Sequence, residues 1–334
     1  MIHLDEWLEF RELNKGQSAS TVANYRAVLV KFSEWLAREL IAETAVTPEI
    51  LQRYAGAELH RRGLSPNSRR VAVSALRGYY AHLQRGGLIP RNPADALPYP
   101  RIGRSLPVPM PLRDAEKILA EPDLDTLKGV RDLAILAVLI GCGPRVSGVV
   151  GINERDLIFT HNDAGIEELT IILREKGKNQ RAVPAPDETR LALRAYLGHP
   201  ELELIDRRLP AGDELLFVNI HNSTVPAHER HGERRRIGAW SVHKMIREYG
   251  KACGIDTKLL HPHAFRHLFG AELAESDVDV ITRQQLLGHS DPKSTEIYSH
   301  LAFRKLRKAA IDANPMRRIK TPMSGLAGVL RAAK

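Results

Sequence analysis

The sequence predicts a mainly helical, α+β protein of two domains, and three observations support this. Apolar residues recur every three to four positions through most of the first hundred residues, which is the period of an amphipathic helix. Seven of the 20 prolines lie between positions 90 and 111. Beyond them, three short β-prone runs stand among further helical patterns. A length of 334 residues also suits two ordinary domains.

The first hundred residues predict four helices that form a small domain over residues 1–100. One helix is expected near residues 3–14, and a second follows Thr21. The second helix has a single apolar face because its apolar residues return every three or four positions. These residues are Val22, Tyr25, Val28, Leu29, Phe32, Trp35, Leu36 and Leu40.

Two further helix starts are marked by an N-cap residue followed by proline at the first helical position. They are Thr47-Pro48 and Ser65-Pro66, and the last helix is expected to stop at the Gly86-Gly87 pair. The apolar residues of that last helix are Val71, Val73, Leu76, Tyr79, Tyr80 and Leu83.

The prolines mark the boundary between the domains. A run of prolines continues neither a helix nor a central strand, because proline lacks the N–H donor that both require. We therefore expect an extended linker over residues 101–111, with the boundary near residue 105. A second domain is expected over residues 112–310 and a tail over residues 311–334.

The second domain begins with helical patterns at about 112–120 and 127–141, and returns to helices after about 238. Between them the pattern predicts one small antiparallel sheet with a hairpin-like turn at Gly177-Lys178-Asn179. Its runs are Leu157–Phe159, Leu169–Leu173 and Arg181–Val183, and a further strand-like run, Glu214–Ile220, lies in an otherwise polar loop region over 198–237.

The charge balance favours a polyanionic partner. There are 49 Lys and Arg against 40 Asp and Glu, which gives a net charge of +9. No apolar run approaches the roughly 20 residues that a spanning helix needs, so we expect no membrane partner. With two cysteines, and no signal-peptide pattern in the opening MIHLDEWLEF, we expect a cytoplasmic protein.

Basic residues also gather in the last helical region of the first domain. Arginines spaced along one element suit contacts with phosphates, and the alternative is a solvated helix face. The residues are Arg61, Arg62, Arg69, Arg70 and Arg77.

The second domain carries an ordered set of residues suited to phosphate chemistry. The set begins with an arginine at the end of an apolar helix, in CGPRVSG, and a lysine at the hairpin tip, in REKGKNQR. HPHAFRH then places a histidine and an arginine three residues apart on one helix face. LLGHS holds another histidine, and STEIYSH a tyrosine nine residues later. In order these residues are Arg145, Lys176, His263, Arg266, His289 and Tyr298.

This ordered set resembles the tyrosine recombinase family, which includes the phage integrases and the Xer-type recombinases. The most specific piece is LLGHSDPKSTEIYSH, followed by HPHAFRH. The resemblance covers residues 112–300, and the first domain is similar to the family's core-binding domain. It implies that Tyr298 is the nucleophile and that Arg145 and Arg266 hold the scissile phosphate. It also implies that Lys176 protonates the leaving oxygen.

The remaining implied roles belong to two histidines: His263 assists proton transfer and His289 hydrogen-bonds a non-bridging oxygen.

The cleavage of a phosphodiester requires groups of these kinds, independently of the resemblance. Paired guanidinium donors suit the charge that develops on a phosphodiester. A phenol with a pKa near 10 attacks well only beside a base or a strong positive field. A 5′-alkoxide leaves readily only with a proton.

The match departs from the family in places. Pro144 precedes the first arginine, and Gly148 stands where the family has an acidic residue, so Glu154 or Asp156 is a candidate substitute. Lys178 remains a second candidate for the hairpin lysine. His263 and His267 are four apart, but no glutamate follows His263, so the zinc pattern H-E-x-x-H fails.

We therefore expect no metal and no other cofactor. The resemblance implies double-stranded DNA with a specific target site as partner, a homotetramer on DNA, a 3′-phosphotyrosine intermediate and a Holliday junction, all without ATP. Accessory proteins are left open. The basic tail after Tyr298 either docks on a neighbouring protomer, as the family's tails do, or is frayed. The rival functions are a type IB topoisomerase, a DNA-binding protein that does not cut, and a basic helical protein with no DNA role.

Overall fold

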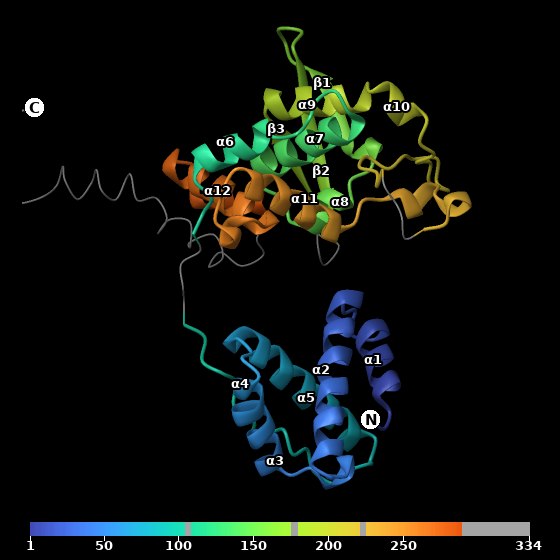
Figure 1. Cartoon of the computed structure of the whole chain (residues 1–334), viewed down its shortest axis with the longest axis vertical. Helices are drawn as coiled ribbons and strands as arrows, with labels where there is room; N and C mark the ends of the chain where they lie inside the picture. Colours follow the sequence, from blue (N-terminus) through green and yellow to red (C-terminus); the bar gives the residue numbers. More distant parts are fainter. Residues whose placement is uncertain (104–107, 175–179, 221–224, 289–334) are drawn as a thin grey trace, which may run out of the picture. The chain divides into compact units, whose positions relative to one another are not determined.

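A computed structural model describes residues 1–103, 108–174, 180–220 and 225–288 of the chain. The fold is 59% helix with one three-stranded antiparallel sheet, so the predicted α+β class is confirmed. The chain divides into two compact units, Met1–Ser105 and Leu106–Lys334, which are described separately below (Figure 1). Within the described ranges, no helix is both long and apolar enough to cross a membrane.

The first unit contains the four predicted helical segments. Its helices are α1 (Leu4–Leu13), α2 (Ala19–Arg38), α3 (Pro48–Gln52), α4 (Leu59–Arg61) and α5 (Pro66–Arg85). A π-helical turn, η2 (Arg53–Glu58), joins α3 and α4 into one stretch, and a 3-10 turn, η1 (Glu43–Ala45), precedes it.

The predicted helix caps of this unit are confirmed. The Thr47 hydroxyl accepts a hydrogen bond from the backbone N–H of Ile50 at 3.4 Å, and the Ser65 hydroxyl accepts one from Ser68 at 3.2 Å. Each cap satisfies an N–H group that the first helical turn leaves without an intrahelical partner. Gly86 caps the C-terminal end of α5, as predicted.

Two apolar positions were assigned to the wrong environment. Leu40 lies beyond the end of α2, in a left-handed turn, and is 93% exposed. Val71 is 40% exposed because it lines an open hollow between α2, α4 and α5. Helical spacing gave both positions the correct period, but it does not show where a helix ends or which part of its apolar face stays uncovered.

Aromatic side chains from different helices form the core of the first unit. The ring centroid of Tyr54, from η2, lies 4.7 Å from that of Phe32 and 5.0 Å from that of Trp35, both on α2. Trp7 of α1 stacks on Tyr25 with centroids 5.6 Å apart. Rings at these separations bury large apolar areas and gain favourable ring–ring contacts, so they hold α1, α2 and η2 together.

The second unit combines helices with the small sheet. Its elements are α6 (Leu112–Ala120), α7 (Leu127–Cys142), α8 (Val146–Val150), β1 (Leu157–His161), β2 (Glu167–Arg174), β3 (Gln180–Ala185), α9 (Asp187–Leu197), α10 (Pro200–Glu203), α11 (Ala239–Ala252), α12 (Pro262–Glu275) and α13 (Val280–Leu287). Short 3-10 turns are η3 (Glu154–Asp156), η4 (Ala227–Glu229), η5 (Gly232–Arg235) and η6 (Thr257–Leu259).

The sheet has the order β1-β2-β3, and all three predicted runs lie in it. Phe159 of β1 pairs with Leu169 of β2, and Ile171 of β2 pairs with Val183 of β3. Along β2 the buried residues alternate, as expected for a sheet with one face on the core. The predicted turn at residues 177–179 lies outside the described residues.

The strand predicted at Glu214–Ile220 is wrong. This segment makes only isolated bridges, such as Asn153 with Leu215 and Val218 with Arg236. Its residues from Leu215 to Val218 are almost completely buried. The run is apolar because it crosses the core, and among the described residues no neighbouring segment runs beside it far enough to form a ladder.

Helix α7 is the central element of the second unit. It packs against α9 and α12, and Figure 1 shows it between α9 and the pair α11 and α12. Its buried carboxylate, Asp132, accepts hydrogen bonds from Arg131 at 2.6 Å and from the Tyr249 hydroxyl at 2.9 Å. Because the carboxylate is paired, its burial is tolerated and it links α7 to α11.

Gly143 ends α7 in a left-handed conformation with φ of 56°, and a Cβ atom there would lie 2.3 Å from Cδ1 of Phe269. We expect Gly143→Ala to lower the free energy of unfolding by about 2–5 kcal/mol, because it adds left-handed strain and overpacking. Urea denaturation measures the loss.

Gly165→Ala is the matched control, since Gly165 has φ of 74° and no atom within 4 Å of the added Cβ. That variant should lose only the strain, about 1–2 kcal/mol. Equal losses in the two variants would show that the Phe269 contact contributes nothing.

Candidate active site

Arg145 stands at the junction between α7 and α8. The chain leaves α7 through Gly143 and Pro144, and Arg145 is the N-cap residue of α8. Its carbonyl accepts hydrogen bonds from the backbone N–H groups of Gly148 at 2.9 Å and Val149 at 3.2 Å. The backbone at Arg145 is therefore set by two helix ends, and its half-buried side chain starts from a fixed point.

The two carboxylates considered as substitutes for an acidic residue at position 148 have other arginine partners. Glu154 pairs with Arg207 at 2.7 Å. Asp156 pairs with Arg174 and accepts from the backbone N–H of Asn153 at 3.0 Å. Gly148 itself is buried in α8.

Arg266, on α12, is buried with only 3% of its surface exposed. Its Nη1 donates to the backbone carbonyl of Gly143 at 2.7 Å, and its Nη2 donates to the carbonyl of Leu287. These carbonyls lie at the C-terminal ends of α7 and α13, where helix dipoles place partial negative charge. The guanidinium is thereby held between two helix ends, one of which leads directly to Arg145.

His263 is the second residue of α12 and is exposed at the surface. Partial loss of hydration around its ring is the largest cause that lowers the pKa of His263. The positive charges of Arg266 and Arg145 lower this pKa further, together with that of His261. His263 therefore lies within electrostatic reach of both Arg145 and Arg266, although more than a hundred residues separate Arg145 from the other two.

The other predicted site residues are not placed. Lys176, its alternative Lys178, His289 and Tyr298 all lie outside the described residues. The described chain resumes at Gln180, just after the hairpin segment, and ends at Gly288, immediately before His289.

Three further histidines surround the site, and the sequence prediction assigned them no role. His261 is the N-cap of α12, and its Nδ1 accepts from the N–H of Ala264 at 3.1 Å. The His267 ring centroid lies 6.4 Å from that of His263. His243 comes from α11, and burial lowers its pKa, with His261 and Arg247 adding to the effect. His261 and His267 lie in the motif HPHAFRH, so their place in the sequence pointed to the site. No feature of the sequence pointed to His243.

Loss of hydration, followed by the charges of its neighbours, lowers the pKa of His267 to about 4. A neutral imidazole is therefore the stable form at neutral pH. Over the described part of the chain, no group of three or more His, Cys, Asp or Glu side chains is arranged to hold a metal ion.

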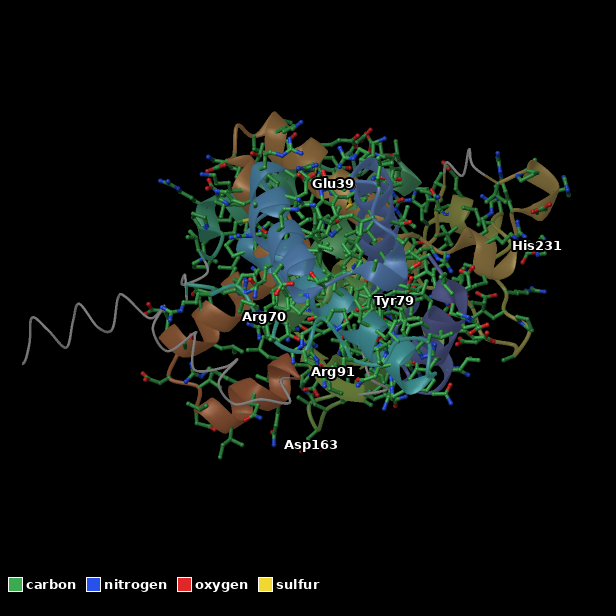
Figure 2. All side chains as sticks on the ribbon, turned by 90° about the horizontal axis from the view of Figure 1, so that it is seen from below. Glu39, Arg70, Tyr79, Arg91, Asp163 and His231 are labelled. Carbon is green, nitrogen blue, oxygen red and sulfur yellow. The ribbon has the colours of Figure 1, made fainter. Side chains whose placement is uncertain are left out.

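The arginines predicted to bind DNA in the first unit have mixed surroundings. Arg61 pairs with Glu58 at 2.7 Å. Arg70, labelled in Figure 2, is exposed and lies over the Tyr99 ring at 4.9 Å, and Arg77 lies over the same ring at 5.2 Å. Ring contacts of this kind hold the guanidiniums by their faces and leave their edges directed elsewhere.

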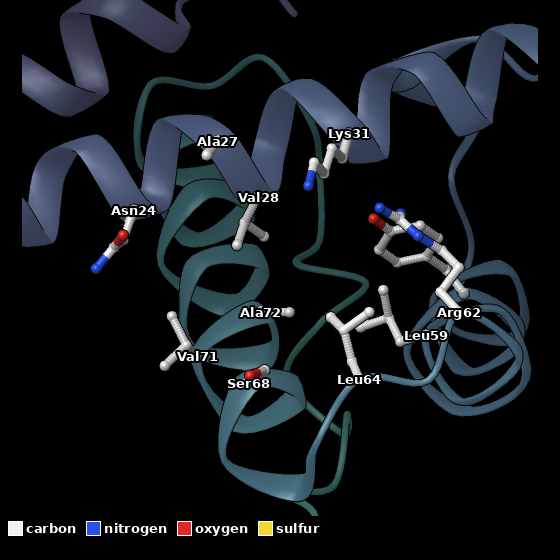
Figure 3. Close-up of a pocket in the computed structure, with 11 residues that line it drawn as sticks. Asn24, Ala27, Val28, Lys31, Leu59, Arg62, Leu64, Ser68, Val71 and Ala72 are labelled. Carbon is white, nitrogen blue, oxygen red and sulfur yellow. The ribbon is translucent and has the colours of Figure 1, made fainter. Parts of the chain in front are cut away.

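Arg62 belongs to the hollow between α2, α4 and α5. Figure 3 shows Arg62 and Lys31 on one side of this hollow, with Ser68 and Val71 of α5 on the other. The floor of the hollow is apolar and its rim carries the cations Arg62 and Lys31, so the hollow is positively charged, like the arginines nearby. Arg69, in the first turn of α5, is half-buried.

Known proteins match the chain almost from end to end. Residues 110–305 match the phage integrase family, and residues 4–87 match the phage integrase N-terminal SAM-like domain. A XerD tyrosine recombinase of Pseudomonas putida is 30% identical over 312 residues, covering 93% of this chain and 97% of the relative. A XerC tyrosine recombinase of Chromobacterium violaceum is 32% identical over 303 residues, 91% of each chain.

Solved structures agree with the fold. A post-cleavage complex of the XerH site-specific recombinase with a palindromic difH substrate matches with a TM-score of 0.67 at 19% identity, over 92% of this chain and 83% of that one. A lambda integrase dimer on a COC′ core site matches with a TM-score of 0.60 at 15% identity, over 88% and 75%.

The sequence relationships and the fold together define a DNA strand-transferring enzyme of the tyrosine recombinase type. The chain belongs to the phage integrase family. The resemblance inferred from the motif order is thus confirmed.

The lowered pKa of His267 has a consequence for stability. The unfolded chain binds a proton at His267 near pH 6.5, whereas the folded chain does so only near pH 4. Stability contributed by neutral His267 is therefore complete above pH 6.5 and is lost as the pH falls from 6.5 toward 4. We expect His267→Gln to show a smaller drop in unfolding free energy between pH 7 and pH 5 than the wild type.

Urea denaturation of both proteins at the two pH values measures this difference. His228→Gln is the control, because His228 is exposed in η4, away from α12. If His267→Gln and the wild type lose equal stability between pH 7 and pH 5, His267 is not held neutral by the fold.

Proposed function

We propose that the protein is a site-specific recombinase that cleaves and rejoins DNA through a 3′-phosphotyrosine formed on Tyr298. The observation that carries the proposal is the gathering of Arg145, His263 and Arg266 at the ends of α7 and α12. An electropositive site of this composition suits an anionic phosphodiester. Family membership supports the same chemistry.

The two arginines would bind the non-bridging oxygens of the scissile phosphate. Arg266 is anchored by carbonyls on two helices, so its guanidinium needs no reorganisation when charge builds up in the transition state. Arg145 would approach from the start of α8. Removing one preorganised donor of this kind typically costs about 3–4 kcal/mol of barrier.

In the cleavage step the Tyr298 oxygen forms a bond to phosphorus, and the bond from phosphorus to the 5′ oxygen breaks. His263, held neutral, accepts the phenolic proton. Lys176, or Lys178, donates a proton to the departing 5′ oxygen. His289 donates a hydrogen bond to a non-bridging oxygen of the phosphate.

Rejoining reverses these transfers. A 5′-hydroxyl from the other DNA strand attacks the phosphotyrosine, and the tyrosine oxygen leaves. The ester keeps the energy of the original bond, so no ATP is needed, and the positive charge at the site comes from side chains rather than from a metal. Exchange of strands between two sites in this way passes through a Holliday junction.

The proposed partner is double-stranded DNA with a specific target site, bound by a homotetramer on two such sites. Structural neighbours solved on DNA, XerH on difH and lambda integrase on a core site, support DNA as the partner. We assign DNA binding to residues 1–100 and catalysis to residues 112–310. Residues 101–111 would be the linker, and residues 311–334 would dock on a neighbouring protomer.

The decisive variant is Tyr298→Phe, which removes only the attacking oxygen. It should form no covalent adduct with a nicked target site, while its dissociation constant for the intact site stays within about 2-fold of the wild type, because one hydroxyl adds little to phosphate-dominated binding. Denaturing gel electrophoresis of the labelled DNA detects the adduct.

Adduct formation by Tyr298→Phe would refute the assignment of the nucleophile. If the wild type bound its site but formed no adduct, the protein would be a DNA-binding protein that does not cut. Relaxation of supercoiled DNA without site preference would instead indicate a type IB topoisomerase.

We also expect Arg70→Ala to weaken DNA binding equally at all sequences and to reduce the slope of log K against log salt by about 1, as loss of one phosphate contact does. Binding assays at several salt concentrations measure the slope.

Arg53→Ala is the matched control. Arg53 also lies over a ring, that of Trp35 at 5.2 Å, but it is paired with Glu39 at 2.8 Å. An unchanged slope in Arg70→Ala, or an equal change in both variants, would contradict a specific phosphate contact at Arg70.

A further inference from the structure

The C-terminal end of α13 is held by side chains from two other elements. The last four carbonyls of a helix have no partner within the helix, and here they belong to residues 284–287. Gly288, with φ of 62°, turns its N–H back to the carbonyls of Gln284 and Gln285. The two remaining carbonyls, of Leu286 and Leu287, accept from arginines.

Arg266 of α12 donates to the Leu287 carbonyl, and Arg181 of β3 donates through Nη1 to the Leu286 carbonyl. Two guanidiniums thus meet the end of α13 at which its dipole places negative charge, an arrangement that stabilises a helix end. One arginine attaches this end to α12 and the other attaches it to the sheet.

These polar bonds matter because α13 has little apolar anchoring. Leu287 packs in a small cluster with Ala271 and Ala274 of α12, and Leu286 is a partly buried residue against the main core. Exposed positions such as Ile281 show that much of the helix faces outward. A helix of eight residues with so few apolar contacts also depends on specific hydrogen bonds for the position of its end.

Arg181 also lies near the end of α7. Burial raises the pKa of the Cys142 thiol to about 12, and the positive charge of Arg181 opposes that rise. Cys142 is the last residue of α7, and Arg266 donates to the carbonyl of Gly143, the next residue. Both guanidiniums therefore lie near the ends of α7 and α13.

These ends lead to proposed catalytic residues. Arg145 follows α7 by three residues, and His289 follows Gly288 directly. Arg181 itself comes five residues after Lys176. Arg181 therefore lies beside the ends of α7 and α13, on the strand that follows Lys176 in the sequence.

We propose that Arg181 is a positioning residue for strand transfer: by holding the Leu286 carbonyl, it fixes the end of α13, which leads directly to His289 in the sequence, relative to Arg145 and Arg266. Arg181 acts through the α13 backbone and makes no contact with DNA. The inference rests on the proposed function, since it concerns the placement of a residue assigned there to the phosphate.

The test compares Arg181→Met with Arg181→Lys. Methionine fills similar space without a donor, so amide exchange should speed up at residues 283–288 and stay unchanged elsewhere. The single-turnover rate of adduct formation on a nicked target should fall about 100-fold, as a misplacement of about 1 Å does. DNA affinity should stay within about 2-fold of the wild type, because phosphate contacts dominate binding.

Lysine keeps one charged donor, so Arg181→Lys should recover most of the exchange protection and at least about 10-fold of the lost rate, since a charge-assisted bond is restored without the fork geometry. Arg194→Met is the matched control: Arg194 is paired with Glu167 and lies over the Phe159 ring, away from α13. It should leave exchange at residues 283–288 and the adduct rate unchanged. If Arg181→Met does not fold, Arg181→Leu replaces it with the same expectations, because leucine also lacks a donor.

A wild-type adduct rate in Arg181→Met would overturn this inference alone, and so would a general loss of exchange protection in which rate and DNA affinity fall together. Failure of lysine to recover any rate would also count against it. Absence of an adduct with the wild-type protein would overturn the proposed function, and this inference with it.

Discussion

The second unit depends on one buried guanidinium. Arg266 donates to the carbonyls of Gly143 and Leu287, and so ties the ends of α7 and α13 to α12. Burial of an isolated charge costs several kcal/mol, and here hydrogen bonds to carbonyls at two helix ends offset that cost. The bonds also fix the direction in which the guanidinium points. A residue that secures the fold is thus, under the proposed function, also a residue that meets the phosphate.

The same positive charge shapes the histidines around it. His263 and His267 have lowered pKa values because partial burial removes hydration and because cations lie close by. Each imidazole is therefore favoured in its neutral form, which accepts a proton. In a site built from arginines, a neutral histidine adds a proton acceptor without adding further positive charge to the cluster.

The two departures from the family pattern have different structural meanings. Pro144 lies between the left-handed Gly143 and the N-cap position of α8, where its fixed backbone angle suits a tight turn. Gly148 leaves no acidic side chain within α8, and the nearby carboxylates Glu154 and Asp156 are paired with other arginines. The backbone of Arg145 is fixed by the bonds that its carbonyl accepts from Gly148 and Val149, at a junction where Gly143 ends α7 in a left-handed conformation.

Sequence by itself determined the fold class, the helix starts at Thr47 and Ser65, and the three strands, because these features depend on local spacing and capping. The family relationship also followed from the order of motifs. Only the tertiary structure decided which groups hold the site together. Arg266 meets Gly143 across 123 positions, and Arg181 meets Leu286 across 105. Their acceptors are backbone carbonyls, which every residue carries, so no side-chain pattern marks them. For the same reason the prediction of a strand at Glu214–Ile220 is wrong, since only its neighbours in space determine whether a buried segment has a ladder partner.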